Sequence, residues 1–220
     1  MTDEIVQSLD IRDRLTQRQV PALMMPRHSN FAPLEHNGHR FIVAEDGLWI
    51  EVRRPWLWLV WPVASSSMKL PYGEALADEM DIAFELDGAA FQQLLERFSV
   101  EAKEVLPAEH AAWFVWDEER ETLEYQPLLT DSASAGGIKF HRPALPDHKH
   151  LAVDVHSHGA MAPFFSGTDD EDDAGEVKLS YVLGHVGSDE EEWRARLCAH
   201  GLFIPFDEEE EYSMVVDPDA

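Results

Sequence analysis

The chain has 220 residues, and 45% of them are hydrophobic, which is enough for a folded core and argues against disorder throughout. Its formal net charge of −26 argues against a nucleic-acid-binding surface, because phosphate contacts need clustered Lys and Arg. Cys198 is the single cysteine, so neither an intramolecular disulfide nor a zinc site built from cysteines can form.

The first residues, Met1 to Ile5, contain neither the basic region nor the apolar run of a secretory signal. The most apolar stretch, Trp56 to Ala64, is far too short to cross a bilayer as a helix. We therefore expect a cytoplasmic protein whose partners include neither membrane nor nucleic acid.

Residues 1–80 predict a β-rich N-terminal unit. A short helical pattern near the start precedes two strands, 40–43 and 48–52, whose connecting turn carries an Asp-Gly hairpin signal. A third strand is predicted over 56–61, and Pro62 and the small residues 64–67 are expected to end it. The tryptophans of this unit either pack in its core or form a partner-binding surface, and core packing is the preferred interpretation.

From residue 81 onward the pattern changes. Residues 82–86 alternate like a strand, and Asp87 is suited to cap a following helix whose apolar side chains recur every three or four positions. Two strands, 111–116 and 122–128, predict a second hairpin around a polar turn.

The last third of the chain predicts a loop and three more strands. A loop rich in Ser, Gly and Pro, residues 131–148, leads to a strand at 151–155. Closing strands are expected at 177–184 and 194–206, and an acidic, solvated tail over 207–220.

The strand at 151–155 runs directly into a His-x-His motif, His156 and His158, which is the strongest chemical signal in the chain. Residues two apart on a strand project from the same face, so both imidazoles can reach one metal ion. Seven residues separate His158 from Ser166, and two more separate Ser166 from Asp169. An aspartate arriving from the next loop or helix would be a third ligand and would leave the fourth position for water, the pattern of a catalytic zinc site.

Incidental histidines in a surface loop are the alternative interpretation of this segment. The chain has 11 histidines, and His148 and His150 form a pair of that kind. The serine and aspartate in register favour the metal site. The acidic run that continues over 170–173 is interpreted as a solvated loop. The alternatives are that these residues add ligands to the metal, or that a slip of one residue makes Asp170 the ligand.

The order His-x-His, seven residues, Ser, two residues, Asp resembles the metal signature of the JAB/MPN metalloproteases, often called JAMM, which also has an upstream glutamate. The predicted elements over residues 81–206 are similar to that family's fold. The resemblance implies an α+β domain of the JAB/MPN type (cytidine-deaminase-like), with a curved mixed sheet flanked by helices. It leaves the β-rich unit, residues 1–80, as an N-terminal extension. Gly159 and Ala112 depart from residues common in the family, but neither is a ligand or the base.

The family's glutamate lies shortly after the first helix, at the start of the next strand. Glu109 occupies that place in this chain. Glu101 and Glu104 are rivals, but they fall within or at the end of the predicted helix.

The resemblance implies a role for each of these residues. The metal would be Zn²⁺ with one bound water, the glutamate would act as general base and then general acid, and the serine would donate to the oxyanion. The substrate would be an amide, either a peptide bond or an isopeptide bond to lysine. The metal ligands implied are His156, His158 and Asp169, and the catalytic residues are Glu109 and Ser166.

The short β-rich extension, the very acidic chain and the solitary domain look most like protein A of the PRTRC system, a bacterial and often plasmid-borne gene set. Such sets also encode a ThiF-like activating enzyme and a ubiquitin-like protein. The resemblance therefore implies that the substrate is the C-terminal tail of a ubiquitin-like protein, or its conjugate. A free peptide or a sulfur-carrier precursor is the competing substrate, and a catalytically silent JAB/MPN scaffold is the competing function.

Overall fold

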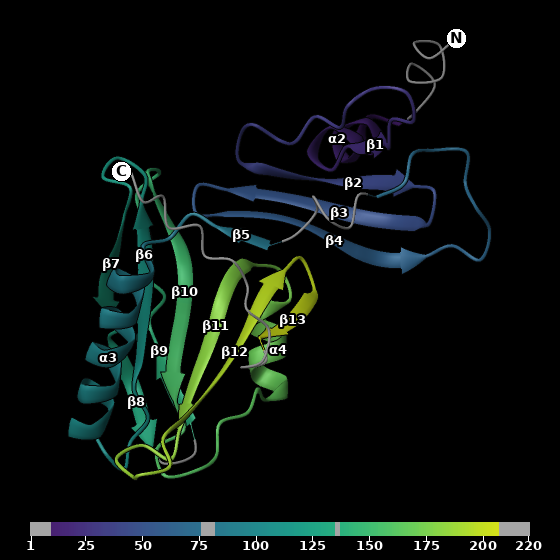
Figure 1. Cartoon of the computed structure of the whole chain (residues 1–220). Coiled ribbons are helices and arrows are strands. Elements are labelled where there is room, and N and C mark those ends of the chain that lie inside the picture. Colours follow the sequence, from purple (N-terminus) through teal and green to yellow (C-terminus); the bar gives the residue numbers. More distant parts are fainter. Residues whose placement is uncertain (1–9, 76–81, 135–136, 207–220) are drawn as a thin grey trace. The chain divides into compact units, whose positions relative to one another are not determined.

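The computed structural model describes residues 10–75, 82–134 and 137–206, and the chain divides into two compact units, Met1–Glu85 and Leu86–Ala220. Each unit has its own main β-sheet (Figure 1). The acidic tail expected over 207–220 lies outside the described residues. Among the residues that are described, no helix has the length and apolar character needed to cross a membrane.

The first unit is a five-stranded sheet in which strands adjacent in sequence are adjacent in space. The first two strands are parallel, and the remaining pairs are antiparallel. Its elements are α2 (Ile11–Gln19), β1 (Ala22–Met24), β2 (Gly38–Ala44), β3 (Gly47–Arg54), β4 (Leu57–Ser65) and β5 (Ile82–Phe84).

The hairpin predicted in this unit is confirmed by β2 and β3. Pro62 does not end the third strand, because β4 continues through it and ends at Ser65, among the small residues. The register of the facing strand shifts between Leu48 and Trp49, opposite the proline. This irregularity lets the ladder continue past a residue that has no N–H to donate.

A buried carboxylate organises the interior of the first unit. Glu51 is completely buried, and it accepts hydrogen bonds from Arg40 Nε at 2.6 Å, Trp58 Nε1 at 3.0 Å and the Leu34 N–H at 2.7 Å. A charge taken out of water is tolerated when it is paired and hydrogen-bonded in this way. Because Trp58 has an internal partner and Trp56 is fully buried, these two tryptophans belong to the core, as preferred from the sequence.

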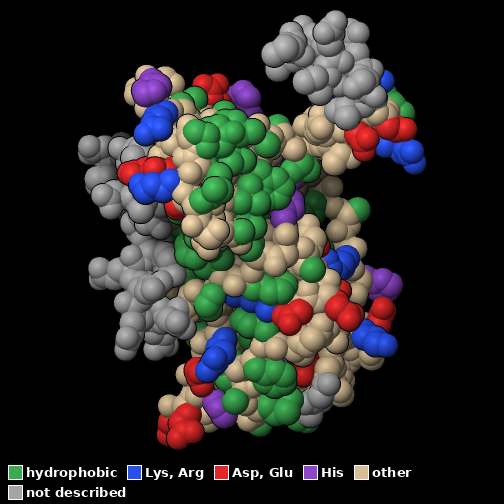
Figure 2. Space-filling view, turned by 90° about the vertical axis from the view of Figure 1, so that its right-hand side faces the viewer, with side chains coloured by type: hydrophobic (Ala, Val, Ile, Leu, Met, Phe, Trp, Pro, Cys, Tyr) green, Lys and Arg blue, Asp and Glu red, His purple; other side chains and the backbone are tan. Residues whose placement is uncertain are grey.

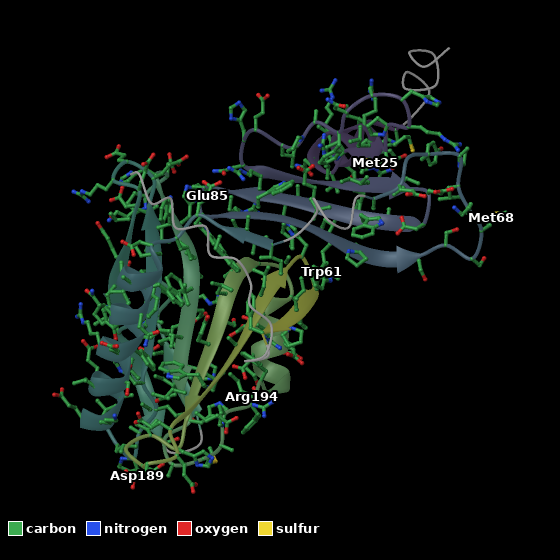
Figure 3. The ribbon with its side chains drawn as sticks, in the orientation of Figure 1. Met25, Trp61, Met68, Glu85, Asp189 and Arg194 are labelled. Carbon is green, nitrogen blue, oxygen red and sulfur yellow. The ribbon has the colours of Figure 1, made fainter. Side chains whose placement is uncertain are left out.

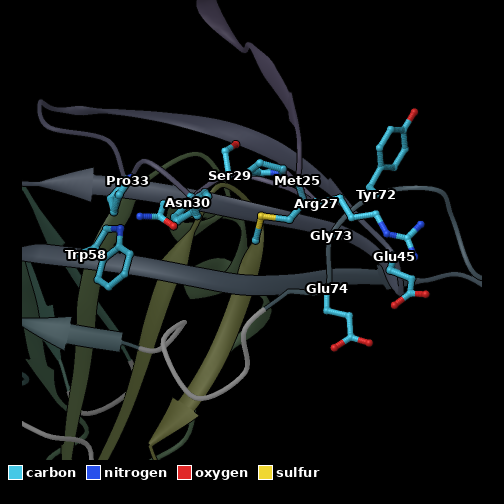
Figure 4. Close-up of a pocket in the computed structure, with 12 residues that line it drawn as sticks. Met25, Arg27, Ser29, Asn30, Pro33, Glu45, Trp58, Tyr72, Gly73 and Glu74 are labelled. Atoms are coloured by element: carbon cyan, nitrogen blue, oxygen red, sulfur yellow. The ribbon is translucent and has the colours of Figure 1, made fainter.

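A pocket of about 750 Å³ also lies in the first unit (Figure 4). Trp58 lines one part of it, and Arg27, Glu45 and Glu74 lie together in another part. Lys69 pairs with Glu45 at 3.0 Å. Charges of both signs therefore balance at this pocket, so its lining favours neither an anionic nor a cationic ligand.

Charged side chains are mixed on the face of the molecule shown in Figure 2. The basic side chains there are scattered among acidic ones. Among the coloured residues of this face, no basic patch of the kind that binds a phosphate backbone is visible. This distribution matches a sequence with 17 basic and 43 acidic residues.

The second unit has a six-stranded sheet in the order β13-β12-β11-β10-β6-β7 and a separate hairpin of β8 and β9. β10 and β11 are parallel, and the other pairs are antiparallel. This mixed sheet with few helices confirms the predicted α+β class. The elements are α3 (Gly88–Glu104), β6 (Ala111–Asp117), β7 (Thr122–Pro127), β8 (Thr130–Ser134), β9 (Gly137–Phe140), β10 (Lys149–Ser157), α4 (Gly167–Asp173), β11 (Val177–Gly184), β12 (Glu192–Ala199) and β13 (Leu202–Phe206).

The predicted helix and its cap are confirmed by α3. The Asp87 carboxylate accepts hydrogen bonds from the N–H groups of Ala89 and Ala90, at 2.9 and 3.1 Å. One face of the helix is buried, and each large apolar side chain on it contributes about 1.5–3 kcal/mol by leaving water. The buried residues are Phe91, Leu95, Phe98 and Ala102.

The strand predicted at 82–86 belongs to the first unit. β5 pairs with β4, with Ile82 opposite Leu59. Glu85, labelled in Figure 3, ends this unit, and its carboxylate pairs with Arg53 Nη2 at 2.6 Å. The boundary expected between residues 80 and 81 lies outside the described residues. The chain divides after Glu85 because β5 finds its hydrogen-bonding partner in the first sheet.

Two other parts of the second unit differ from expectation. Residues 131–148, predicted as a loop, contain most of the β8–β9 hairpin, whose first strand is wholly exposed and therefore has no apolar alternation. The strand predicted at 194–206 is two strands, β12 and β13. His200 and Gly201 separate them with φ values of 50° and 91°, which an extended strand does not adopt.

The strand that carries the histidines is held on both sides. β10 pairs with β6, all of whose seven residues are buried, and with β11. Val153 and Val155 of β10 are themselves fully buried. The central position of β10 gives its C-terminal end a rigid base.

Candidate metal centre

Two histidines meet at the end of β10. His156 lies in the strand and His158 directly after it, and their Nε2 atoms are 3.2 Å apart. The His158 N–H donates to the Leu183 carbonyl of β11 at 2.8 Å, which holds the backbone in place. His158 Nδ1 lies 3.3 Å from the Ala162 carbonyl. A carbonyl only accepts, so this contact places the hydrogen on Nδ1 and the lone pair on Nε2, as in metal-binding histidines.

Asp169 reaches the histidines from the first turn of α4, and Ser166 caps that helix. Ser166 Oγ accepts from the Asp169 N–H at 3.3 Å, and the Ser166 N–H donates to Asp169 Oδ2 at 2.6 Å. This reciprocal capping box explains the spacing of two residues between them. It turns the other oxygen, Asp169 Oδ1, toward His156 Nε2, 3.8 Å away.

These three side chains could hold a metal ion, and their spacing can be compared with that of zinc ligands. One donor atom from each of His156, His158 and Asp169 lies within 4.8 Å of the other two. Tetrahedral ligands at 2.0–2.1 Å from zinc are about 3.3 Å apart, close to the separations of 3.2 and 3.8 Å found here. Burial lowers the pKa of His156, although Asp169 and Asp154 act in the opposite direction. Its neutral, metal-binding form is thereby favoured.

Glu109 lies in the same pocket, of about 250 Å³, as the two histidines and Asp169. The side chain is only 6% exposed, and its backbone N–H donates to the Ser134 carbonyl of β8 at 3.1 Å. Burial, and then the negative charge of Asp169, raise the pKa of Glu109 from 4.5 to about 7. A carboxyl group with this pKa can both accept and return a proton near neutral pH.

The rival glutamates lie elsewhere. Glu101 of α3 accepts a hydrogen bond from Tyr125 Oη at 2.7 Å and pairs with Arg97 Nε at 2.8 Å. Glu104 is exposed in the last turn of the same helix. The structure therefore brings Glu109 to the histidines and gives Glu101 a separate partner network.

Ser157, between the two histidines, is a site residue that the sequence reasoning missed. It is completely buried, and its Oγ accepts from the His110 N–H at 2.9 Å. Its own N–H donates to the His110 carbonyl at 2.9 Å. These two bonds tie the residue after Glu109 to the His-x-His segment. The available signal was alternation, because a residue between two outward histidines must point to the other face of the strand.

The acidic run 170–173 is not a solvated loop, as predicted, but the body of α4. Asp170 pairs with Arg196 Nη1 at 2.5 Å. Asp173 is only 4% exposed. The slip that would make Asp170 a ligand is therefore disfavoured, since its carboxylate is engaged by an arginine while Asp169 lines the pocket.

A second group with possible metal ligands, Asp117, Glu119 and His148, fits a cation less well. Asp117 already accepts from Arg120 Nη1 at 2.8 Å and from two backbone N–H groups, and Lys149 Nζ lies 3.4 Å away. Its negative charge is thus neutralised by neighbouring side chains. This group is better described as a centre of ion pairing.

Two family models match parts of this chain. Residues 91–198 match a family described as prokaryotic homologs of the JAB domain, and residues 10–82 match a domain of unknown function, DUF2016. The first match contains all the residues discussed for the metal centre. No curated protein matches the chain.

Proposed function

We propose that this protein is a zinc-dependent peptidase or isopeptidase, and the match of residues 91–198 to prokaryotic homologs of the JAB domain supports this proposal. The observation that carries the proposal is the convergence of His156, His158 and Asp169 in one pocket with Glu109. JAB domains include inactive members, but this chain has a full set of ligands and a carboxyl group placed for proton transfer. That combination favours hydrolysis over a silent scaffold.

The three ligands would hold zinc through His156 Nε2, His158 Nε2 and Asp169 Oδ1. When bound, zinc polarises a substrate carbonyl and lowers the pKa of water toward about 7. The ligands' own task is to stay in place, and two of them are oriented by the backbone. For His158 this is the contact with Ala162, and for Asp169 it is the capping box.

Glu109 would carry the proton. As a carboxylate it takes a proton from the attacking water, and as the acid it gives that proton to the leaving amine nitrogen when the C–N bond breaks. The pKa of about 7, raised by burial and by Asp169, keeps both forms accessible. The two transfers balance, so the side chain returns to its starting form.

Ser166 would stabilise the negative oxygen of the tetrahedral intermediate. Its Oγ lone pair already accepts from the Asp169 N–H, so the hydroxyl hydrogen remains available to a substrate oxygen. A single donor of this kind contributes about 3–4 kcal/mol to catalysis.

We propose that the substrate is the C-terminal tail of a ubiquitin-like protein, free or conjugated, and that a ThiF-like activating enzyme is a further partner. The similarity to the PRTRC proteins supports this substrate class. The size of the pocket, about 250 Å³, also suits an extended segment of a few residues better than a folded surface. Met161 and Phe164, which are 43% and 49% exposed, offer apolar contacts to such a segment at this pocket.

The test is to incubate the purified protein with ubiquitin-like proteins that carry a short C-terminal extension, and to measure bound zinc in parallel. About one zinc per chain and release of the extension are expected. Glu109→Gln should keep the zinc and lose cleavage. Glu101→Gln is the matched control and should keep both, because Glu101 lies in a separate network.

A wild-type protein that binds zinc but releases no extension from any such substrate would refute the proposed substrate. A wild-type protein that binds no zinc would refute the metallopeptidase, and the scaffold function would then stand.

A further inference from the structure

A lysine is buried behind the metal centre. Lys178 of β11 is 1% exposed, and its Nζ lies 2.8 Å from carboxylate oxygens of Asp154, Asp173 and Glu176. Burying an ammonium group is unfavourable unless it is well paired. These three carboxylates supply that pairing.

Two partners of Lys178 connect it to the metal ligands. Asp154 lies on β10, two residues before His156, and Asp173 lies on α4, four residues after Asp169. One ammonium group therefore joins the strand that carries the histidines to the helix that carries the third ligand.

Arg196 of β12 holds the same helix from a second direction. Its Nη2 lies 2.7 Å from Asp173 Oδ2 and its Nη1 lies 2.5 Å from Asp170 Oδ1. The guanidinium also stacks against two rings, 3.9 Å from Phe165 and 4.2 Å from Phe203. Arg196 thus contacts both α4 and the segment just before Ser166.

α4 needs external support of this kind. It has seven residues, GTDDEDD, and five of them are acidic. A helix this short is unstable by itself, and like charges four apart, such as Asp169 and Asp173, destabilise it further. Since the capping box secures only its first turn, the two cations hold the remainder.

We propose that Lys178 and Arg196 are positioning residues of the metal centre, which set the place of Asp169 relative to His156. The inference rests on the proposed function, because it assumes that these residues hold zinc. It predicts that zinc affinity depends on two side chains that do not touch the metal.

The experiment compares Lys178→Met, Arg196→Lys and the control Lys149→Met with the full-length wild type. Lys149 lies at the opposite end of β10 and pairs with Asp117 and Glu124, so its loss also removes an ion pair from that strand. Zinc affinity is measured by competition with a chromogenic chelator, and the melting temperature of the zinc-free protein is measured for each variant. Co²⁺ absorption reports the ligand geometry separately.

Lys178→Met and Arg196→Lys should each weaken zinc binding about 10–100-fold, as is usual for groups that orient ligands, and should alter the Co²⁺ spectrum. The zinc affinity of Lys149→Met should stay within about twofold of that of the wild type. This should hold even if its melting temperature falls as far as those of the other two variants. If Lys178→Met does not fold, Arg196→Lys decides the matter. Unchanged zinc affinity in the folded variants, with only lower melting temperatures, would overturn the inference while leaving the proposed function intact. A wild type that binds no zinc would overturn both.

Discussion

Replacing Glu109 by glutamine should stabilise the zinc-free protein, and more at alkaline than at acid pH. The carboxyl group has a pKa of about 7 in the folded protein instead of 4.5, because burial and Asp169 oppose its charge. Between these pH values the folded state binds more protons than the unfolded state, so stability falls as the pH rises. At 1.36 kcal/mol per pKa unit, the carboxylate costs about 3 kcal/mol at about pH 8 and about 1 kcal/mol at about pH 5. An uncharged glutamine avoids this cost.

The assay is urea denaturation of the chelator-treated wild type and Glu109→Gln at both pH values. The variant should gain about 2 kcal/mol more at the higher pH, and saturating Zn²⁺ should reduce this gain because a nearby cation favours the carboxylate. Glu101→Gln is the control, for which the opposite change in stability is expected. Burial acts to raise the pKa of Glu101, but hydrogen bonds from Tyr125 and Arg97 lower it overall, so its loss should destabilise at about pH 8. A gain in unfolding free energy from Glu109→Gln that is equal at both pH values would refute the reasoning.

Substitutions at three further positions probe the rest of the site. Asp169→Asn should lower zinc affinity at least about tenfold by loss of a charged ligand, and a chelator titration that matched the wild type would contradict the assigned ligand set. Ser166→Ala should lower kcat about 10²–10³-fold and destabilise by about 0.5–2 kcal/mol through loss of the N-cap, whereas Ser166→Thr should retain most of both. Gly184→Ala should lower the melting temperature and weaken zinc binding, because its Cβ would lie 2.3 Å from Pro163 in the loop between the second histidine and Ser166; a normal melting curve would show that this loop can shift.

Local patterns predicted much of the second unit. The apolar spacing and Asp87 indicated α3 correctly, and the two runs around a polar turn indicated the β6–β7 hairpin, because a helix face or a hairpin depends on residues close in sequence. The α+β class and the JAB resemblance over most of the second unit agree with the family match. The β8–β9 hairpin was missed, since its first strand has no buried face to impose a pattern.

The order and spacing of the His-x-His motif and Asp169 predicted that these side chains could share a metal ion, and the structure brings their donor atoms within 4.8 Å of one another. Which strand pairs with which was decided by tertiary structure alone, so the pairing of β5 with β4 could not be predicted from the sequence. The side chains that hold the helix of Asp169 could likewise not be predicted from the sequence. Lys178 and Arg196 come from two later strands, and an ammonium or guanidinium group can hold a helix only after folding has excluded water and brought its carboxylates within 3 Å.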